Sequence, residues 1–229
     1  MALILSLETA TTVCSVALHE DGVLKAKEEL FVDKSHSSQL TVAIDNVVKN
    51  AGFAYKDLSA VAVSEGPGSY TGLRIGTSTG KGLCYSLDIP LIAVNTLEGM
   101  ANSIKGFNLD GALLCPMLDA RRMEVYCAVY DAEGKELSPT QAVIVEPESY
   151  DKYLEQGKVI FFGNGSDKCV EVFGQHPNAS FWPNVSPSAE GIGNLAYVKY
   201  EQQSFEDVAY FEPFYLKEFR ATKPKKNIF

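Results

Sequence analysis

The order of hydrophobic and polar positions divides the first fifty residues into strands and one helix. Apolar side chains dominate residues 3–8, 13–19 and 23–32, and each run has the length of a strand. The Asp21-Gly22 pair between the second and third runs is a strong hairpin signal. Residues 35–38 supply capping side chains, Gly52 ends the next segment, and the apolar positions between them have helical spacing: Leu40, Ala43, Ile44, Val47, Val48 and Ala51. The pattern predicts three strands in hairpin order, followed by one helix.

A glycine-rich segment lies between two further apolar strands. Residues 59–64 and 90–94 are predicted as strands and residues 69–86 as the helix between them, so they form a right-handed βαβ unit with parallel strands. Gly72, Gly76 and Gly80 recur at every fourth position and share one helical face, although each costs about 1 kcal/mol relative to alanine. Either these glycines let the helix lie close to its own sheet, or they flatten a surface on which another helix or chain docks. A phosphate at the helix N-terminus is a third interpretation, but neither phosphate-loop spacing is present.

The second half of the chain begins with the same pattern as the first. Residues 112–118 and 123–130 are predicted strands, and Glu133-Gly134 makes a hairpin turn into a third strand that reaches Val145. When Glu8 is aligned with Asp119, the hairpin glycines fall within one position of each other. The pattern indicates a duplicated three-stranded module with an acidic residue at the end of each first strand.

The rest of the second half contains fewer helical patterns. Residues 147–156 resemble a short helix, residues 158–162 a strand, and residues 187–203 a helix that starts at Pro187. We therefore predict an α/β protein of two domains, residues 1–98 and a reduced second domain of residues 99–229, each a mixed sheet flanked by helices. The 187–203 helix is a candidate to pack back on the first domain.

Composition and charge exclude several classes of protein. Of 229 residues, 46% are hydrophobic and 21% charged, as in ordinary globular proteins, and the net charge of −9 argues against a broad nucleic-acid-binding surface. Residues 214–229 are an exception, because they carry five basic residues; they are either a solvated tail or a contact to tRNA or a partner protein. The sequence shows no signal peptide, no membrane-spanning stretch and no C-x-x-C pair among its five cysteines, so we expect a reduced, cytoplasmic protein without membrane contact.

The two acidic turns are the best candidates for chemistry. The duplicated strand order and the threonine-rich first turn resemble the actin, Hsp70 and sugar-kinase superfamily, whose RNase H-like domains hold a nucleotide phosphate between paired turns. On that resemblance the candidate nucleotide-binding residues are Glu8, Thr9, Thr11, Thr12, Asp119 and Arg121, with Mg²⁺ held through water by the carboxylates. The alternative is that Glu8 and Asp119 only end strands at a domain interface. The three histidines have no metal-binding spacing and no serine lies in a G-x-S-x-G elbow, so we assign no catalytic and no metal-ligating residue.

Longer motifs resemble one particular family. GPGSYTGLRIG at residues 66–76 resembles the signature of the TsaB (YeaZ) family, subunits of the bacterial machinery that makes tRNA N6-threonylcarbamoyladenosine. The resemblance extends to ILSLETAT at residues 4–11, the His36-Ser37 pair, VNTLEGMA at 94–101, LDARRMEVY at 118–126 and PFYLK at 213–217. It therefore covers nearly the whole chain.

The resemblance implies a non-catalytic scaffold. Family members pair with TsaD, the larger paralogue that transfers the threonylcarbamoyl group, are joined by the ATPase subunit TsaE, reach tRNA only through the complex, and form homodimers without TsaD. The helices involved correspond to residues 36–50 and 69–86, and the predicted partner-binding residues are His36, Leu40, Tyr70, Gly72, Leu73, Gly76, Thr77, Gly80 and Cys84. The alternatives are a stand-alone ATP-dependent phosphotransferase and a glycoprotease-like peptidase.

One residue departs from the family pattern. Many members have Asp where this chain has Glu8, and the additional methylene makes direct phosphate or Mg²⁺ chemistry by the first turn less favoured. We expect no cofactor held by this chain alone, and ATP or ADP with Mg²⁺, if bound, at the interface with the partner.

Overall fold

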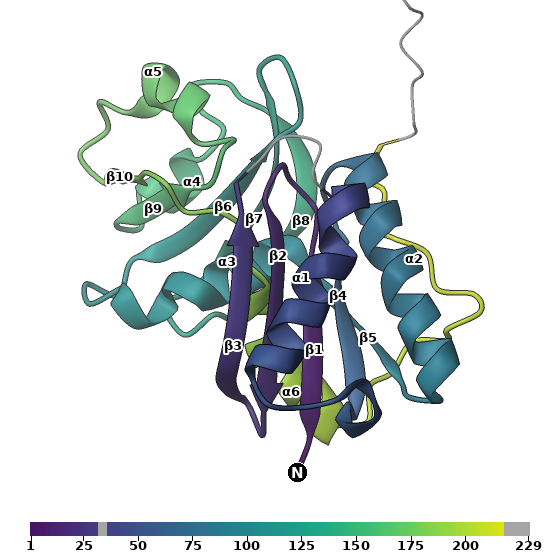
Figure 1. Cartoon of the computed structure of the whole chain (residues 1–229). Coiled ribbons are helices and arrows are strands. Elements are labelled where there is room, and N and C mark those ends of the chain that lie inside the picture. Colours follow the sequence, from purple (N-terminus) through teal and green to yellow (C-terminus); the bar gives the residue numbers. More distant parts are fainter. Residues whose placement is uncertain (32–35, 218–229) are drawn as a thin grey trace, which may run out of the picture.

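The computed structural model describes residues 1–31 and 36–217, which form two five-stranded sheets (Figure 1). The first sheet has the order β3-β2-β1-β4-β5, with β2 and β3 antiparallel and β4 and β5 parallel to their neighbours. Its strands are β1 (Leu3–Glu8), β2 (Cys14–Glu20), β3 (Val23–Leu30), β4 (Ala60–Gly66) and β5 (Leu91–Asn95). The predicted capping residue Ser35 and the predicted end of the third strand at Val32 lie outside the described residues.

The second sheet repeats this topology. Read from β8 it has the order β8-β7-β6-β9-β10, again with two antiparallel pairs followed by two parallel pairs. Its strands are β6 (Leu113–Asp119), β7 (Glu124–Tyr130), β8 (Glu136–Ile144), β9 (Val159–Phe162) and β10 (Ala179–Trp182). The predicted architecture of two related mixed sheets is therefore confirmed, and Glu8 and Asp119 occupy the same position at the ends of β1 and β6.

The two halves differ mainly in their helices. The first contains α1 (His36–Asn50), η1 (Tyr55–Asp57), α2 (Tyr70–Leu87), α3 (Thr96–Ile104) and η2 (Lys105–Phe107). The second contains α4 (Asp151–Leu154), η3 (Asp167–Cys169), α5 (Val170–Phe173) and α6 (Ala189–Glu201). The crossover from the fourth to the fifth strand is thus the long helix α2 in the first half, and only the short η3 and α5 in the second.

Several elements were not predicted from the sequence. Helix α3 begins directly after β5, where the Asn95 side chain accepts hydrogen bonds from the N–H groups of Leu97 (2.9 Å) and Glu98 (3.3 Å). This cap was a readable signal, but the helix is short and has no long apolar repeat. The short η3–α5 segment and the four-residue strand β10 have still weaker local patterns, because tertiary contacts decide such elements.

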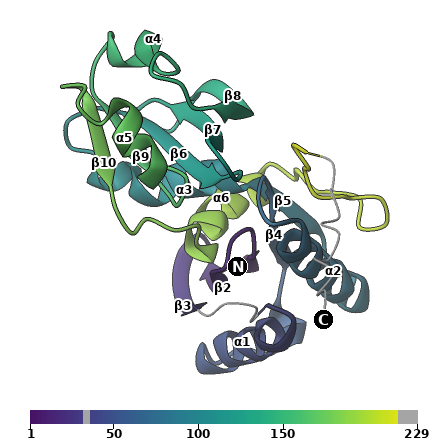
Figure 2. The same cartoon turned by 90° about the horizontal axis from the view of Figure 1, so that it is seen from above.

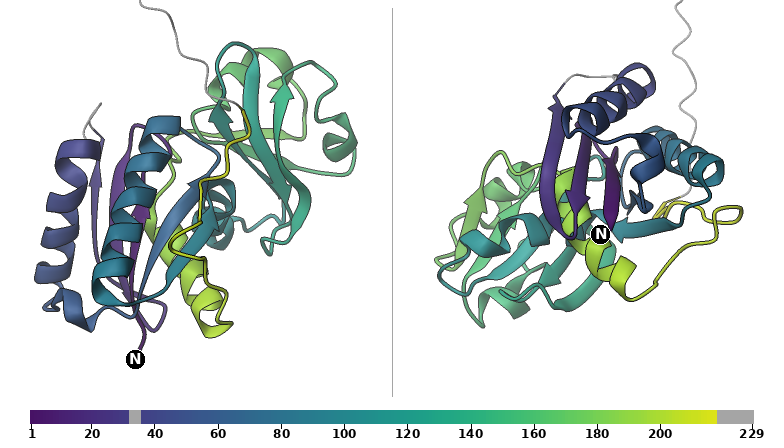
Figure 3. Two further views of the ribbon diagram at one scale, coloured as in Figure 1. Left: turned by 90° about the vertical axis from the view of Figure 1, so that its right-hand side faces the viewer. Right: turned by 60° about the horizontal axis from the view of Figure 1, so that its bottom comes forward.

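Alternating residues of the first sheet face different helices. Leu3, Leu5 and Leu7 pack in one core with α1 and α2, whereas Ile4 packs on the opposite face with Ile192 and Ala196 of α6. Helices α1 and α2 therefore lie side by side on one face of the first sheet, and α6 covers the other (Figures 2 and 3). Helix α3 packs on the second sheet and against α6, so these two helices lie between the sheets.

The segment after α6 returns along the first domain toward the second. Lys81 of α2 donates hydrogen bonds to the carbonyl oxygens of Ala209 (3.0 Å) and Phe211 (3.1 Å), and the Phe214 N–H donates to the Glu65 carbonyl (2.7 Å). The segment then reaches Lys217, beside the second sheet. All five cysteines are buried and free, and no helix within residues 1–31 and 36–217 has the length and apolarity needed to cross a bilayer.

Candidate functional site

The first acidic turn is closed by hydrogen bonds to its own domain. The Glu8 side chain is fully buried, and its Oε1 accepts hydrogen bonds from the Ala10 N–H (2.6 Å) and the Ser64 hydroxyl (3.0 Å). The Thr9 hydroxyl donates to the Gly72 carbonyl in the first turn of α2 (2.8 Å). The turn is therefore fixed to both β4 and α2.

Burial also changes the protonation of Glu8. Removal of the carboxyl group from water raises its pKa from 4.5 to about 7, although the hydrogen bonds from Ala10 and Ser64 act in the opposite direction. Glu8 Oε2 is buried and has no hydrogen-bond partner among the described residues. Near neutral pH the Glu8 carboxyl group is therefore protonated, and so uncharged, in a large fraction of the molecules.

The remaining threonines of the turn point to different surroundings. Thr11 Oγ1 accepts a hydrogen bond from the Val13 N–H (3.2 Å), and the Thr11 carbonyl lies 2.6 Å from Nε2 of His36 at the start of α1. Thr12 is exposed. Of the predicted nucleotide-binding residues in this turn, Thr12 is exposed and Thr11 is partly exposed, whereas Glu8 and Thr9 are buried.

Helix α2 covers this turn because its glycines allow a close approach. A Cβ atom added to Gly72 would overlap the Thr9 carbonyl oxygen, and one added to Gly76 would overlap the Thr9 hydroxyl. At Gly80 the added atom would lie 2.6 Å from Cγ1 of Val63 in β4. The contacts support the first interpretation of the glycine row, close packing on the home sheet, and correct the second, because this face of α2 is not open to a partner.

The predicted partner-binding residues divide accordingly. Leu40, Leu73, Thr77, Cys84 and the three glycines are buried in the first domain, whereas His36 and Tyr70 are partly exposed. Tyr70 packs its ring 4.9 Å from that of Tyr215, and its hydroxyl accepts a hydrogen bond from Arg74 (2.8 Å). The outward face of α2 instead presents Thr71, Arg74, Ser78 and Tyr85.

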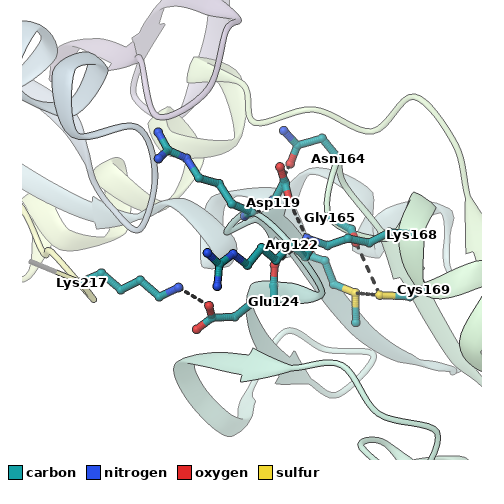
Figure 4. Close-up of polar contacts among 10 residues, drawn as sticks. Asp119, Arg122, Glu124, Asn164, Gly165, Lys168, Cys169 and Lys217 are labelled. Carbon is teal, nitrogen blue, oxygen red and sulfur yellow. Dashed lines mark hydrogen bonds and ion pairs between the residues drawn. The ribbon is translucent and has the colours of Figure 1, made fainter. Parts of the chain in front are cut away.

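The second acidic turn is organised by a lysine (Figure 4). Lys168 of η3 forms an ion pair with the Asp119 carboxylate, and its ammonium group also donates to the carbonyl oxygens of Arg122 (2.8 Å) and Glu124 (2.6 Å). The Asp119 N–H donates to the Asn164 side chain (3.0 Å). These contacts use the three donors of the lysine within a single turn.

The tip of the second turn has an unusual backbone. Arg121 and Arg122 both have a left-handed backbone conformation, with φ of 71° and 50°. Each such residue other than glycine costs about 1–2 kcal/mol, so the surrounding bonds must hold the conformation. The Arg121 N–H donates to the Asp119 side chain (3.1 Å), and the Glu124 N–H donates to the Arg121 carbonyl (3.2 Å). Both arginines are exposed.

The residues present do not fit a Mg²⁺–nucleotide held by this chain alone. A water-bridged Mg²⁺ needs charged, accessible carboxylates. Glu8 is buried with a raised pKa, and the Asp119 carboxylate is paired with Lys168. Within the described part of the chain no cluster of three histidine, cysteine or acidic side chains is placed to hold a metal ion. Nucleotide binding at an interface with a partner stays a prediction.

Lys168 and Asn164 are not among the site residues predicted from the sequence. Asn164 lies shortly after β9 and Lys168 lies in η3, which follows; β9 runs parallel to β6, so the ends of the two strands meet at one edge of the sheet. The polar sequence GNGSDK after the predicted strand at residues 158–162 was the available signal. Gly165 allows the approach, because an added Cβ would lie 2.7 Å from the carbonyl carbon of Leu118.

Comparison with known protein families gives consistent results. Residues 30–223 match the family model described as TsaD, tRNA N6-adenosine threonylcarbamoyltransferase. A protein of Escherichia coli (strain K12) named tRNA threonylcarbamoyladenosine biosynthesis protein TsaB is 30% identical over 222 residues, which are 93% of this chain and 94% of that protein. The protein of the same name from Bacillus subtilis (strain 168) is 36% identical over 145 residues, 62% of either chain.

Solved structures confirm the fold. A Pseudomonas aeruginosa protein described as similar to peptidase YeaZ matches 95% of this chain and all of its own, with a TM-score of 0.84 and 26% identity. The activator of 2-hydroxyisocaproyl-CoA dehydratase from Clostridium difficile, solved with bound ADPNP, matches 90% of this chain and 98% of its own, with a TM-score of 0.51 and 11% identity. The second likeness concerns the fold alone, and it agrees with the predicted arrangement of two mixed sheets flanked by helices.

Proposed function

The chain belongs to the TsaB family of tRNA threonylcarbamoyladenosine biosynthesis proteins, and we propose that it acts there as a non-catalytic subunit. In this proposal it binds the larger paralogue TsaD and supports the transfer of the threonylcarbamoyl group to the adenosine beside the anticodon. The proposal extends to a cytoplasmic location, to TsaE as a further partner, and to homodimers when TsaD is missing.

One observation carries the non-catalytic role. The carboxyl group of each turn is already bonded to its own chain: Glu8 to Ala10 and Ser64, and Asp119 to Lys168. A phosphotransferase that used these acids would need them charged and open to Mg²⁺. The chain therefore has the architecture of a nucleotide-binding fold, but its acidic residues support the turns themselves.

The surface formed by α1 and α2 suits a partner protein. The two helices lie side by side on the outer face of the first sheet (Figures 1 and 3). Val42 of α1 is 49% exposed and Tyr85 of α2 is 85% exposed. Large aromatic side chains are typical anchors of protein interfaces. We propose that the partner contacts this outward face rather than the buried glycine face.

Reconstitution tests the function directly. Purified TsaD, TsaE, tRNA and the threonylcarbamoyl donor system are combined with and without this chain, and the modified nucleoside is measured. We expect little modification without the chain and full modification with it. Equal modification in both reactions would contradict the proposal, and tight binding of Mg-ATP by the isolated chain in calorimetry would favour the phosphotransferase alternative.

A matched pair of tyrosines tests the surface. Tyr85→Asp should weaken TsaD binding by about tenfold or more, because it removes an aromatic anchor and adds a charge to the interface. Tyr210, which is 84% exposed on the segment after α6, provides the control Tyr210→Asp with the same change of charge. Binding is measured by calorimetry or surface plasmon resonance. Equal affinities of the two variants would exclude the outward face of α2 as the contact.

A further inference from the structure

The tip of the second turn carries two arginines that the proposed subunit role does not use. The chain has only four arginines, Arg74, Arg121, Arg122 and Arg220, and two of them are adjacent here. Both are exposed, and both are held in the left-handed conformation by the bonds around Asp119 and Lys168. Backbone strain of this kind persists only where the surrounding contacts fix it.

The charges around this tip are paired in a selective way. Lys168 is bound to Asp119, and Lys217 is bound to Glu124 beside it (Figure 4). Each of these two carboxylates therefore already forms an ion pair with a lysine. Within residues 1–31 and 36–217, no carboxylate forms an ion pair with the Arg121 or Arg122 guanidinium group. The two guanidinium groups are thus the local surplus of positive charge on a chain whose net charge is −9.

The neighbouring residues add features of a phosphate contact. Tyr126 of β7 is partly exposed, and the Lys217 ammonium lies 5.7 Å from the centre of its ring. Arginine presents a planar fork that pairs with phosphate oxygens through two parallel hydrogen bonds. A turn fixed before binding loses little conformational entropy on contact. The exposed tip is suited to an extended polyanion that passes over it.

We propose that Arg121 and Arg122 contact the phosphate backbone of RNA, and specifically of the tRNA bound by the complex. This inference rests on the proposed function, since that function brings tRNA to the chain. The overall negative charge repels RNA elsewhere on the surface, so a local pair of arginines both attracts the RNA and limits where it binds. Phosphate contacts of this kind position the RNA without reading its sequence.

The test compares three double variants in the full chain. Arg121→Ala/Arg122→Ala removes the guanidinium groups. Arg121→Lys/Arg122→Lys keeps the two positive charges but removes the planar groups that can form two parallel hydrogen bonds to a phosphate. Lys56→Ala/Lys135→Ala is the matched control, because both lysines are exposed, lie outside the turn and give the same change of net charge. Binding of fluorescently labelled, unmodified tRNA to the complex with TsaD is measured by anisotropy at roughly 50 to 200 mM salt.

We expect the alanine variant of the arginines to bind tRNA about tenfold more weakly. The slope of the logarithm of the binding constant against the logarithm of the salt concentration should fall in magnitude by roughly 1.5, as for the loss of two phosphate contacts. The lysine variant should recover part of the affinity, and the control should bind as the original chain does. Equal weakening in the control would overturn the proposal, because only net charge would then matter. Unchanged tRNA binding in the alanine variant would overturn it as well.

Affinity for TsaD is measured in parallel on the same proteins. If the alanine variant loses TsaD binding but not tRNA binding, the arginines contact protein carboxylates and the RNA proposal is wrong. If the original chain itself does not bind TsaD, the proposed function fails, and tRNA binding is then compared among the variants of the isolated chain. This comparison among the isolated variants still decides whether the arginines contact RNA. Circular dichroism confirms that each variant is folded.

Discussion

The two acidic turns occupy the same position in two copies of one topology, yet their surroundings are opposite. Glu8 is fully buried beneath α2, whereas the Asp119 side chain is 47% exposed and paired with Lys168. The difference lies in the crossover between the fourth and fifth strands. An 18-residue helix with a glycine face covers the first turn, and the short η3 segment covers less of the second and supplies a lysine. The length of one connection therefore decides whether an acid becomes a buried structural group or part of an exposed turn.

The largest expected effect concerns the charge of Glu8. Because burial raises its pKa from 4.5 to about 7, the folded state binds the proton more tightly than the unfolded state. Its contribution to stability is fully present below pH 4.5 and is lost as the pH rises through 7. Glu8→Gln keeps the shape of the neutral acid, so the variant should exceed the original chain in unfolding free energy by up to roughly 3 kcal/mol at about pH 8. The two should agree near pH 4.5.

Urea unfolding at several pH values measures this difference. The comparison with glutamine isolates Glu8 from the other titrating groups, which both chains share. A constant difference between about pH 4.5 and pH 8 would show that the carboxyl group of Glu8 is not held in the neutral form, and the contrast between the two turns would then be lost.

A pair of glycines on α2 tests the close packing. Gly72→Ala forces a methyl group onto the Thr9 carbonyl and should destabilise the protein by about 2 kcal/mol. Gly82 lies on the same helix with no atom within 4 Å of an added Cβ, so Gly82→Ala should stabilise it by about 0.5–1 kcal/mol. Urea unfolding of both variants gives the sign of each change in unfolding free energy. Two changes of the same sign would contradict the role assigned to the glycine face.

Replacing the lysine of the second turn should destabilise the protein less than Gly72→Ala does. Lys168 is 20% exposed and bonds three acceptors, so Lys168→Met should cost about 1–2 kcal/mol and speed hydrogen exchange at residues 119–125. Lys158, 60% exposed and paired with Asp110, is the matched control, and Lys158→Met should change stability by less than about 0.5 kcal/mol. Equal changes in stability for the two variants would show that the Lys168–Asp119 contact contributes no more than an ordinary surface ion pair.

The sequence predicted the duplicated strands because their hydrophobic runs and hairpin glycines are local signals. It also placed an acidic residue at the end of β1 and of β6. It could not show that Glu8 is buried, since this depends on how closely α2 approaches Thr9 across 63 residues of chain. For the same reason the sequence could not decide between close packing and partner docking as the role of the glycine row, and the contacts of Gly72 and Gly80 favour close packing. Lys168 pairs with Asp119 across 49 residues, and only the parallel alignment of β6 and β9 brings them together.

The most direct test of the account is tRNA modification reconstituted with the Glu8→Gln chain. In the proposed role this carboxyl group is structural and the chain acts through its partner. The variant should therefore bind TsaD and support modification at the rate of the original chain, while a reaction without the chain remains inactive. A folded Glu8→Gln chain that binds TsaD normally but fails to support modification would contradict the account, because Glu8 would then take part in the chemistry.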